Sequence, residues 1–455
     1  MTLRPAPIPP PPRFYGGLLA LLFVYLTFAR LHEGTSTFLL LRDQMRDWTL
    51  ALGPFRALPL TGPQSTAGGA SLGPIYYWVL WLTRCLIGPW FNNLPLAGAY
   101  GIAVLQGCAD LFLFDTIRRR TGSSWVAFAV TLLSATSPHE LAVSSTIWNP
   151  AVSVAFAKLA IALRLRFDRD ASLWWTAATT ACAWFAVQAH SAAIFVALPL
   201  TASYVVSDAL ARRFGRALQQ IRVILEVILV LQVPFFISAL TQSSDIAPTR
   251  AIGGASEILA SGGLRWQASL LALVHSVVSI LCAPWGFAFW TPLFVVCAIG
   301  VAIRSRHDLA LVSAVIAPLV VAVAGLALWQ GNYDSYWYLP LAPCAAIMIV
   351  LALTTWRPAL TGAVLAVLLL AGQPARIAAS DFSYRMQEYG PLLRGTQRIV
   401  RQTRQLRRLT TSFLMPPFSD ETYLFTVLGG RLSEDAEFDA VINERGDVQF
   451  TRVAR

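Results

Sequence analysis

Charge is scarce in this sequence. Only 13% of its 455 residues are Asp, Glu, Lys or Arg, whereas 56% are apolar and the mean hydropathy is +0.58. Soluble globular domains carry about 25% charged residues. The shortage excludes an intrinsically disordered chain and argues against a soluble globular one, because apolar residues have replaced the missing charge. Lipid is therefore the expected solvent for most of the chain.

Cysteine and lysine are scarce as well. The six cysteines lie in or beside apolar segments and form no CxxC or Cys/His cluster, which argues against a disulfide framework or a zinc site. Lys158 is the only lysine, a bias that suggests a GC-rich coding sequence. The net charge of +11 comes from small Arg clusters between apolar runs. Such spacing is typical of a membrane-topology signal, so no nucleic-acid partner is expected.

Eleven apolar segments are close to the ~20 residues that a membrane-spanning helix needs. They are 14–31, 95–117, 124–138, 150–164, 172–188, 190–207, 221–240, 286–303, 309–329, 338–355 and 358–373. The Arg clusters fall at every second junction if the N-terminal tail, residues 1–13, is cytoplasmic, as the positive-inside rule requires. No small-residue cleavage site follows the first segment, which predicts an uncleaved first membrane helix. The predicted fold is an all-α polytopic membrane protein with a transmembrane domain over 14–373.

Two further apolar stretches, 75–90 and 266–284, are predicted to lie at the outer interface or against the bundle, since single crossings there would put later Arg clusters outside. Eleven crossings then place the C-terminus outside. Residues 374–455 hold 10 of the 24 acids, an Arg-rich stretch, and strand-like alternation at 422–430 and 440–453. They are predicted to form a small soluble α/β domain that influences the choice of acceptor.

The first outer loop, about residues 32–94, carries two acids. Asp43 and Asp47 are four residues apart, so they share one face of a short helix just beyond the first span. Two carboxylates there could supply a general base and a second electrostatic or binding group. The alternative is a solvated helix face on which both acids pair with Arg42 or Arg46.

A Gly/Pro-rich stretch follows these acids and ends in GPIYYW at 73–78. It lacks the GK[ST] ending of a phosphate loop. The carboxylates followed by this stretch resemble the first outer loop of the C-type integral-membrane glycosyltransferases, specifically the bacterial relatives of dolichyl-phosphate-mannose protein mannosyltransferases and of the lipid A aminoarabinose transferase. Three later segments resemble that group too: SPHELAVSSTIWNP (137–150), VQAHSAAIFVALP (187–199) and DSYWYLPLAP (334–343).

The resemblance implies transfer of a sugar from a polyprenyl-phosphate donor to an acceptor on the outer face, with inversion at the anomeric carbon. It makes Asp43 the general base, which can take the proton of an attacking hydroxyl. The family usually has Asp-Glu at this point, so Gln44 departs from the pattern and leaves any second acidic role to Asp47. The departure weakens the case for a metal. We therefore assign no metal ligand and no cofactor, and a divalent metal is left open.

The departing phosphate gathers negative charge, so the outer interface needs cationic or hydrogen-bonding groups. The candidates are Arg56, Arg84, Arg265, His190, Tyr336 and Tyr338. Interfacial anchoring, snorkelling and helix packing explain the same side chains without a ligand. The second outer loop adds four residues that could shape an acceptor pocket, although a plain loop with a helix start explains them as well. They are His139, Glu140, Trp148 and Asn149.

The main alternative function is a polytopic transporter or lipid flippase, and a membrane scaffold is a third. Transporters tend to have inverted repeats and charges at mid-membrane. No repeat is visible here, and Asp110, Asp115 and Glu226 are expected near the inner helix ends without a catalytic role. We therefore expect a transferase of the bacterial inner membrane. Its partners would be the bilayer, a polyprenyl-phosphate sugar donor, and a glycan, lipid or protein acceptor.

Overall fold

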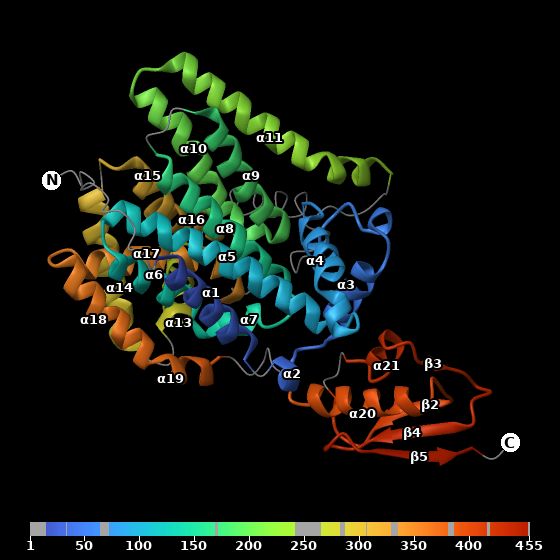
Figure 1. Ribbon diagram of the computed structural model, residues 1–455. Coiled ribbons are helices and arrows are strands. Elements are labelled where there is room, and N and C mark those ends of the chain that lie inside the picture. The colour runs from blue at the N-terminus through green and yellow to red at the C-terminus, as the bar shows by residue number, and fades with distance from the viewer. Residues whose placement is uncertain are drawn as a thin grey trace.

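A helical bundle forms most of the protein, and a small α/β unit lies at one corner of it (Figure 1). This computed structural model describes residues 15–32, 34–63, 72–168, 172–241, 265–282, 287–305, 307–328, 335–380, 386–415 and 419–453. The predicted cytoplasmic tail, residues 1–13, lies outside the described residues.

Each of the eleven apolar segments contains a helix. These helices are α1 (Tyr15–Leu31), α5 (Leu96–Thr121), α6 (Ser124–Ala135), α8 (Asn149–Arg166), α9 (Leu173–Ala189), α10 (Ile194–Leu210), α11 (Phe214–Thr241), α14 (Phe287–Ser305), α16 (Ala317–Leu326), α17 (Ala342–Leu353) and α18 (Pro358–Ala371). Within the described residues, six helical stretches are long and apolar enough to cross a membrane. The number is seven if α6 and α7 (Pro138–Ser144), bent by 62°, form one span. The count of eleven crossings stays a prediction.

Outward faces of the bundle are apolar. Large exposed apolar side chains follow α11 and α18, among them Leu225, Leu229, Val233, Phe236, Leu360, Val364 and Val367. Contiguous apolar surface on this scale is typical of contact with lipid rather than with water. The chain is therefore an integral membrane protein, as its composition predicts.

The two apolar stretches expected not to cross singly are helices that pack against the bundle. α4 (Ile75–Leu86) has 12 residues, or about 18 Å of helix, too short for a hydrocarbon core of about 30 Å. It packs against α5, α9 and the helix α3 (Arg42–Leu52). α13 (Trp266–Cys282) has 17 residues and packs against α14, α16 and the turn Ser335–Leu341. The length and packing of α4 agree with the prediction that it does not cross the membrane singly. For α13 that placement stays a prediction.

The α/β unit follows α19 (Gln373–Ala378). It contains α20 (Tyr389–Gln402), α21 (Tyr423–Val427), β1 (Gln405–Leu406), β2 (Arg408–Thr411), β3 (Arg431–Leu432), β4 (Phe438–Ile442) and β5 (Val448–Arg452). β4 is parallel to β2 and antiparallel to β5, and β1 pairs with β3 in parallel. Gly395 of α20 lies directly against Ile442 of β4. The small α/β region is confirmed.

One strand prediction in this unit is wrong. Residues 422–430 begin with α21 instead of a strand, and their two glycines end that helix. Gly429 adopts a φ of 87°, and its N–H donates to Thr426 O while Gly430 N–H donates to Phe425 O. These two bonds form a Schellman motif, which satisfies the last helical carbonyls. The Gly-Gly pair is therefore a helix stop.

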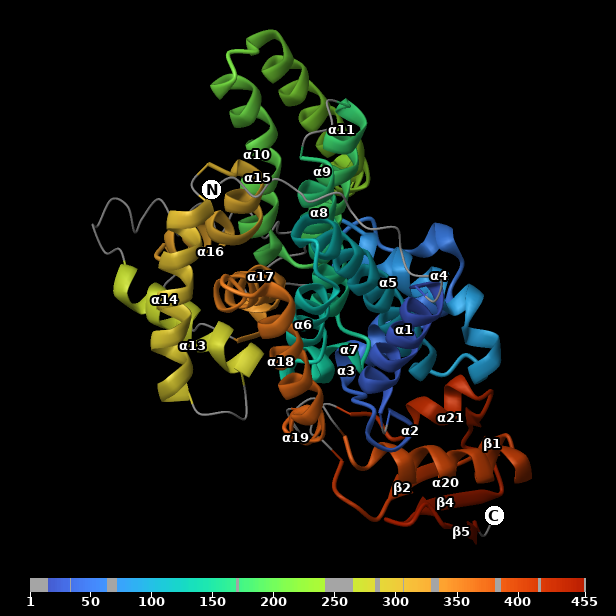
Figure 2. The same cartoon turned by 60° about the vertical axis from the view of Figure 1, so that its left-hand side comes forward.

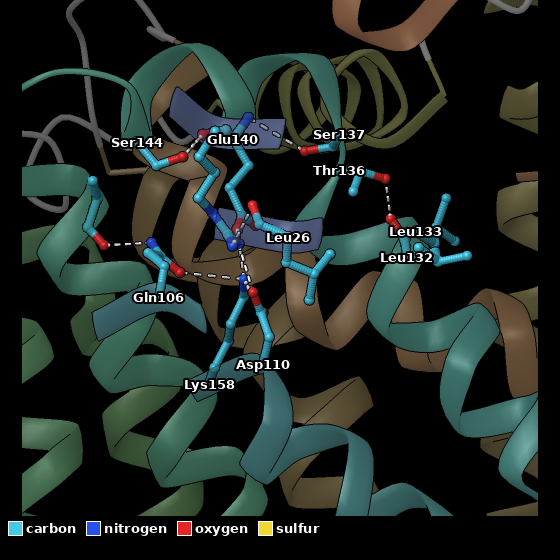
Figure 3. A network of polar contacts seen from close by, with 12 residues as sticks. Leu26, Gln106, Asp110, Leu132, Leu133, Thr136, Ser137, Glu140, Ser144 and Lys158 are labelled. Atoms are coloured by element: carbon cyan, nitrogen blue, oxygen red, sulfur yellow. Dashed lines mark hydrogen bonds and ion pairs between the residues drawn. The ribbon is translucent and has the colours of Figure 1, made fainter. Parts of the chain in front are cut away.

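Four ionised side chains from four helices meet inside the bundle (Figure 3). Arg30 Nη2 donates to Asp110 Oδ2 and to Glu140 Oε1, both at 2.6 Å. Lys158 Nζ donates to Asp110 Oδ1 at 2.7 Å and to Glu140 Oε1 at 2.6 Å. None of these side chains is more than 2% exposed. Two cations and two carboxylates thus neutralise one another where isolated charges would be very unfavourable.

This buried quartet corrects two predictions. Asp110 lies in the bundle interior and not at the inner helix end, and Glu140 binds Arg30 and Lys158 instead of lining an acceptor pocket. Asp115 pairs with Arg118, Arg119 and Arg166 near the C-terminal end of α5.

Replacing Lys158 tests the quartet. Lys158→Met should destabilise the protein by about 3–5 kcal/mol, because it leaves two buried carboxylates with one cation. Thermal unfolding in detergent micelles measures the loss. Arg222→Met is the control, since Arg222 pairs with Glu226 on an exposed surface and should leave the melting temperature unchanged. Equal melting of Lys158→Met and wild type would show that the quartet does not hold the bundle together.

Candidate functional site

Helix α3 carries both acids of the first outer loop. Gln44, at its third position, accepts a hydrogen bond from Leu41 N–H at 3.2 Å, which is half of a capping box. Asp43 in the first turn interacts favourably with the helix dipole. The inner face buries Met45 and Trp48, and the Trp48 indole donates to Asn93 O at 2.7 Å. The helix is thereby fixed to the far end of the same loop.

Both acids contact one arginine. Arg46 Nη1 lies 3.0 Å from Asp43 Oδ1, and Arg46 Nη2 lies 2.8 Å from Asp47 Oδ1. The pairing with Arg46, left open by the sequence, is therefore present. The two carboxylates differ in access, because the Asp43 side chain is 69% exposed and that of Asp47 only 6%. Asp43 can meet a substrate directly, and Asp47 cannot.

Asp47 is enclosed by the GPIYYW motif at the start of α4. Tyr77 donates a hydrogen bond to Asp47 Oδ1 at 3.3 Å, and the Tyr76 and Tyr77 rings lie 5.4 Å apart. Burial raises the pKa of Asp47 from its ordinary 3.8 to about 6, against the opposing effect of Arg46. The motif therefore supports a buried acid whose charge changes near neutral pH.

The segments that resemble the family converge in space. Gly73 lies directly against Gln188, since a Cβ built on this glycine would come within 2.4 Å of the Gln188 amide carbon. Asn149 Nδ2 donates to Ala189 O at 2.8 Å. The ring of Tyr336 lies 5.7 Å from that of His190 and 5.1 Å from that of Trp148. These contacts join the four segments 73–78, 137–150, 187–199 and 334–343.

We call Asn149, His190 and Tyr336 the polar cluster. All three side chains are partly buried. Tyr338, from the same turn as Tyr336, is 0% exposed. His139 is partly buried on α7.

The three candidate arginines lie apart from one another in the chain. Arg56 is exposed in a short turn, and Arg84 is in the last turn of α4. Arg265 is exposed before α13, and its N–H donates to Ala327 O at 3.0 Å. In the described part of the chain, no hydrogen bond or ion pair joins Arg56 or Arg84 to the polar cluster. Among all residues that the structure describes, no group of three His, Cys, Asp or Glu side chains could hold a metal ion.

The bundle and the C-terminal α/β unit share the fold of ArnT from Cupriavidus metallidurans, a fold of the GT-C type. The crystal structure of ArnT bound to undecaprenyl phosphate matches with a TM-score of 0.55 at 17% identity, over 92% of this chain and 85% of ArnT. The apo form matches with a TM-score of 0.53 at 16% identity over the same shares. No family model and no curated protein matches the sequence. The resemblance drawn from the motifs is confirmed for the fold.

The buried Asp47 should make stability depend on pH. Its raised pKa means that the folded state binds the proton more tightly than the unfolded state, so stability should fall as pH rises from about 4 to about 6 and then level off. Melting temperatures of wild type and Asp47→Asn measured between about pH 4 and pH 8 isolate this effect. The difference in melting temperature between wild type and Asp47→Asn should change between about pH 4 and pH 6 and stay constant above that. A difference independent of pH would contradict a titrating, buried Asp47.

Proposed function

We propose that this protein transfers a sugar from a polyprenyl-phosphate-linked donor to an acceptor at the outer face of the bacterial inner membrane. The observation that carries the proposal is the fold shared with ArnT over 92% of the chain, since one of those ArnT structures holds undecaprenyl phosphate. The exposed Asp43, on α3 shortly after the first apolar helix, supports the same reaction. The N-terminus is then cytoplasmic and the C-terminus periplasmic.

Asp43 is the proposed general base. It accepts the proton of an acceptor hydroxyl as that oxygen attacks the anomeric carbon, and the bond from this carbon to the phosphate oxygen breaks with its electron pair on the phosphate. Attack opposite to the leaving group inverts the anomeric centre. Arg46 holds the carboxylate of Asp43 in place through their 3.0 Å ion pair. Asp47, which is buried, supports Arg46 from the other side.

The polar cluster is the proposed donor side of the site. An amide, an imidazole and a phenol offer hydrogen bonds to the phosphate as its charge grows. Arg56, Arg84 and Arg265 remain the proposed cationic partners, because a guanidinium matches phosphate geometry. The acceptor is a glycan, a lipid or a protein, and the reaction as proposed uses no cofactor.

A transfer assay with Asp43→Asn tests the base. Radiolabelled sugar is supplied on polyprenyl-phosphate donors to membranes holding matched amounts of folded wild type or variant. The variant should lose about 10²- to 10⁴-fold in turnover, the usual contribution of a general base, and should still bind the donor. Glu226→Gln is the matched control. Glu226 is also an exposed acid that pairs with an arginine on its own helix, at 2.7 Å.

Two results would contradict the proposal. Unchanged turnover in Asp43→Asn would remove Asp43 from the mechanism. Absence of turnover with any donor, together with substrate movement across vesicles, would favour the transporter.

A further inference from the structure

The C-terminal unit is bound directly to the helix that carries the proposed base. Tyr423, on α21, donates a hydrogen bond to Met45 O at 3.0 Å. Its hydroxyl also lies 3.2 Å from Thr49 Oγ1, whose single hydrogen is shared between this hydroxyl and Met45 O at 2.8 Å. Met45 and Thr49 are residues of α3 on either side of Arg46 and Asp47. One tyrosine from the far end of the chain thus binds the middle of α3.

A second set of contacts fixes the segment that leads into α3. Ser419 Oγ donates to Leu40 O at 3.0 Å, and Met386 N–H donates to Thr37 O at 3.0 Å. The rings of Phe38 and Tyr389 lie 5.1 Å apart. Figure 2 shows α20 next to α2 (Gly34–Thr37), whose last residue begins this segment.

These contacts add to those that α3 makes through Trp48 and α4. A helix of 11 residues is only marginally stable in isolation. Asp43 is exposed and is held in place by Arg46 of the same helix, so its position follows that of α3. Burial raises the pKa of Tyr423 to about 12, so its hydroxyl stays protonated and able to donate near neutral pH.

We propose that the C-terminal unit is a positioning domain for the proposed base, with Tyr423 as its positioning residue. It holds α3 so that Asp43 faces the acceptor hydroxyl. The catalytic consequence rests on the proposed function, whereas the hold on α3 does not. A displacement of about 1 Å at a reacting group can lower the rate up to about 10²-fold. Loosening this hold should therefore slow the chemical step with every acceptor, unlike a domain that only selects acceptors.

Tyr423→Phe compared with Tyr389→Phe tests the proposal in the full-length protein. Tyr389 lies at the same interface and is fully buried, but its hydroxyl has no hydrogen-bond partner among the described residues. Tyr423→Phe should lower kcat by about 10-fold or more with little change in KM for the donor, because α3 loses the hydrogen bond from Tyr423 to Met45 O. Tyr389→Phe should stay within about twofold of wild type.

Hydrogen–deuterium exchange supplies a readout that needs no activity. Amides of α3 should exchange faster in Tyr423→Phe than in wild type, and at the wild-type rate in Tyr389→Phe.

The outcomes separate this proposal from the proposed function. If Tyr423→Phe speeds up exchange in α3 but the wild-type protein shows no transfer with any donor, the hold on α3 is supported and the transferase is overturned. Wild-type exchange and wild-type kcat in Tyr423→Phe would overturn the positioning role. A higher KM at constant kcat, or a loss confined to one acceptor, would overturn it as well, because either result indicates substrate binding by this domain.

Discussion

Neutralisation of charge inside the bundle is the constraint on which the candidate site depends. Lipid tails are as apolar as the helices, so the hydrophobic effect alone does little to fix one membrane helix against another. The quartet of Arg30, Asp110, Glu140 and Lys158 supplies that register, since its charges balance only when α1, α5, α7 and α8 are correctly placed. Arg30 lies at the end of α1, where the first outer loop starts, and α7 leads toward Asn149. The quartet therefore sets where both outer segments of the candidate site leave the bundle.

The two acidic residues of the candidate site differ in burial. Asp47 is closed in by Tyr77 and Arg46, and Asp43 remains open to solvent. Gln44 explains how the chain departs from the Asp-Glu pattern without losing the helix start, because its amide oxygen caps Leu41 N–H. A neutral residue at this position also avoids a third negative charge beside one arginine.

Much of the fold could be predicted because a membrane helix is encoded locally, in composition and length. All eleven apolar segments contain helices, and the four motif segments that are far apart in sequence do converge. The quartet could not be predicted, because its partners are between 18 and 110 residues apart and no local pattern connects them. The α21 segment was misread for a related reason. Gly429 and Gly430 resemble a turn between strands, and only their hydrogen bonds reveal a helix stop.

The position of a bound polyprenyl phosphate tests the central claim most directly. We would determine the structure of the protein in lipid nanodiscs with undecaprenyl phosphate by electron cryomicroscopy. The account predicts the phosphate within hydrogen-bonding distance of the polar cluster, Asn149, His190 and Tyr336, on the side of the bundle that carries Asp43. A phosphate bound instead at the opposite helix ends, beside Arg118 and Arg119, would contradict it.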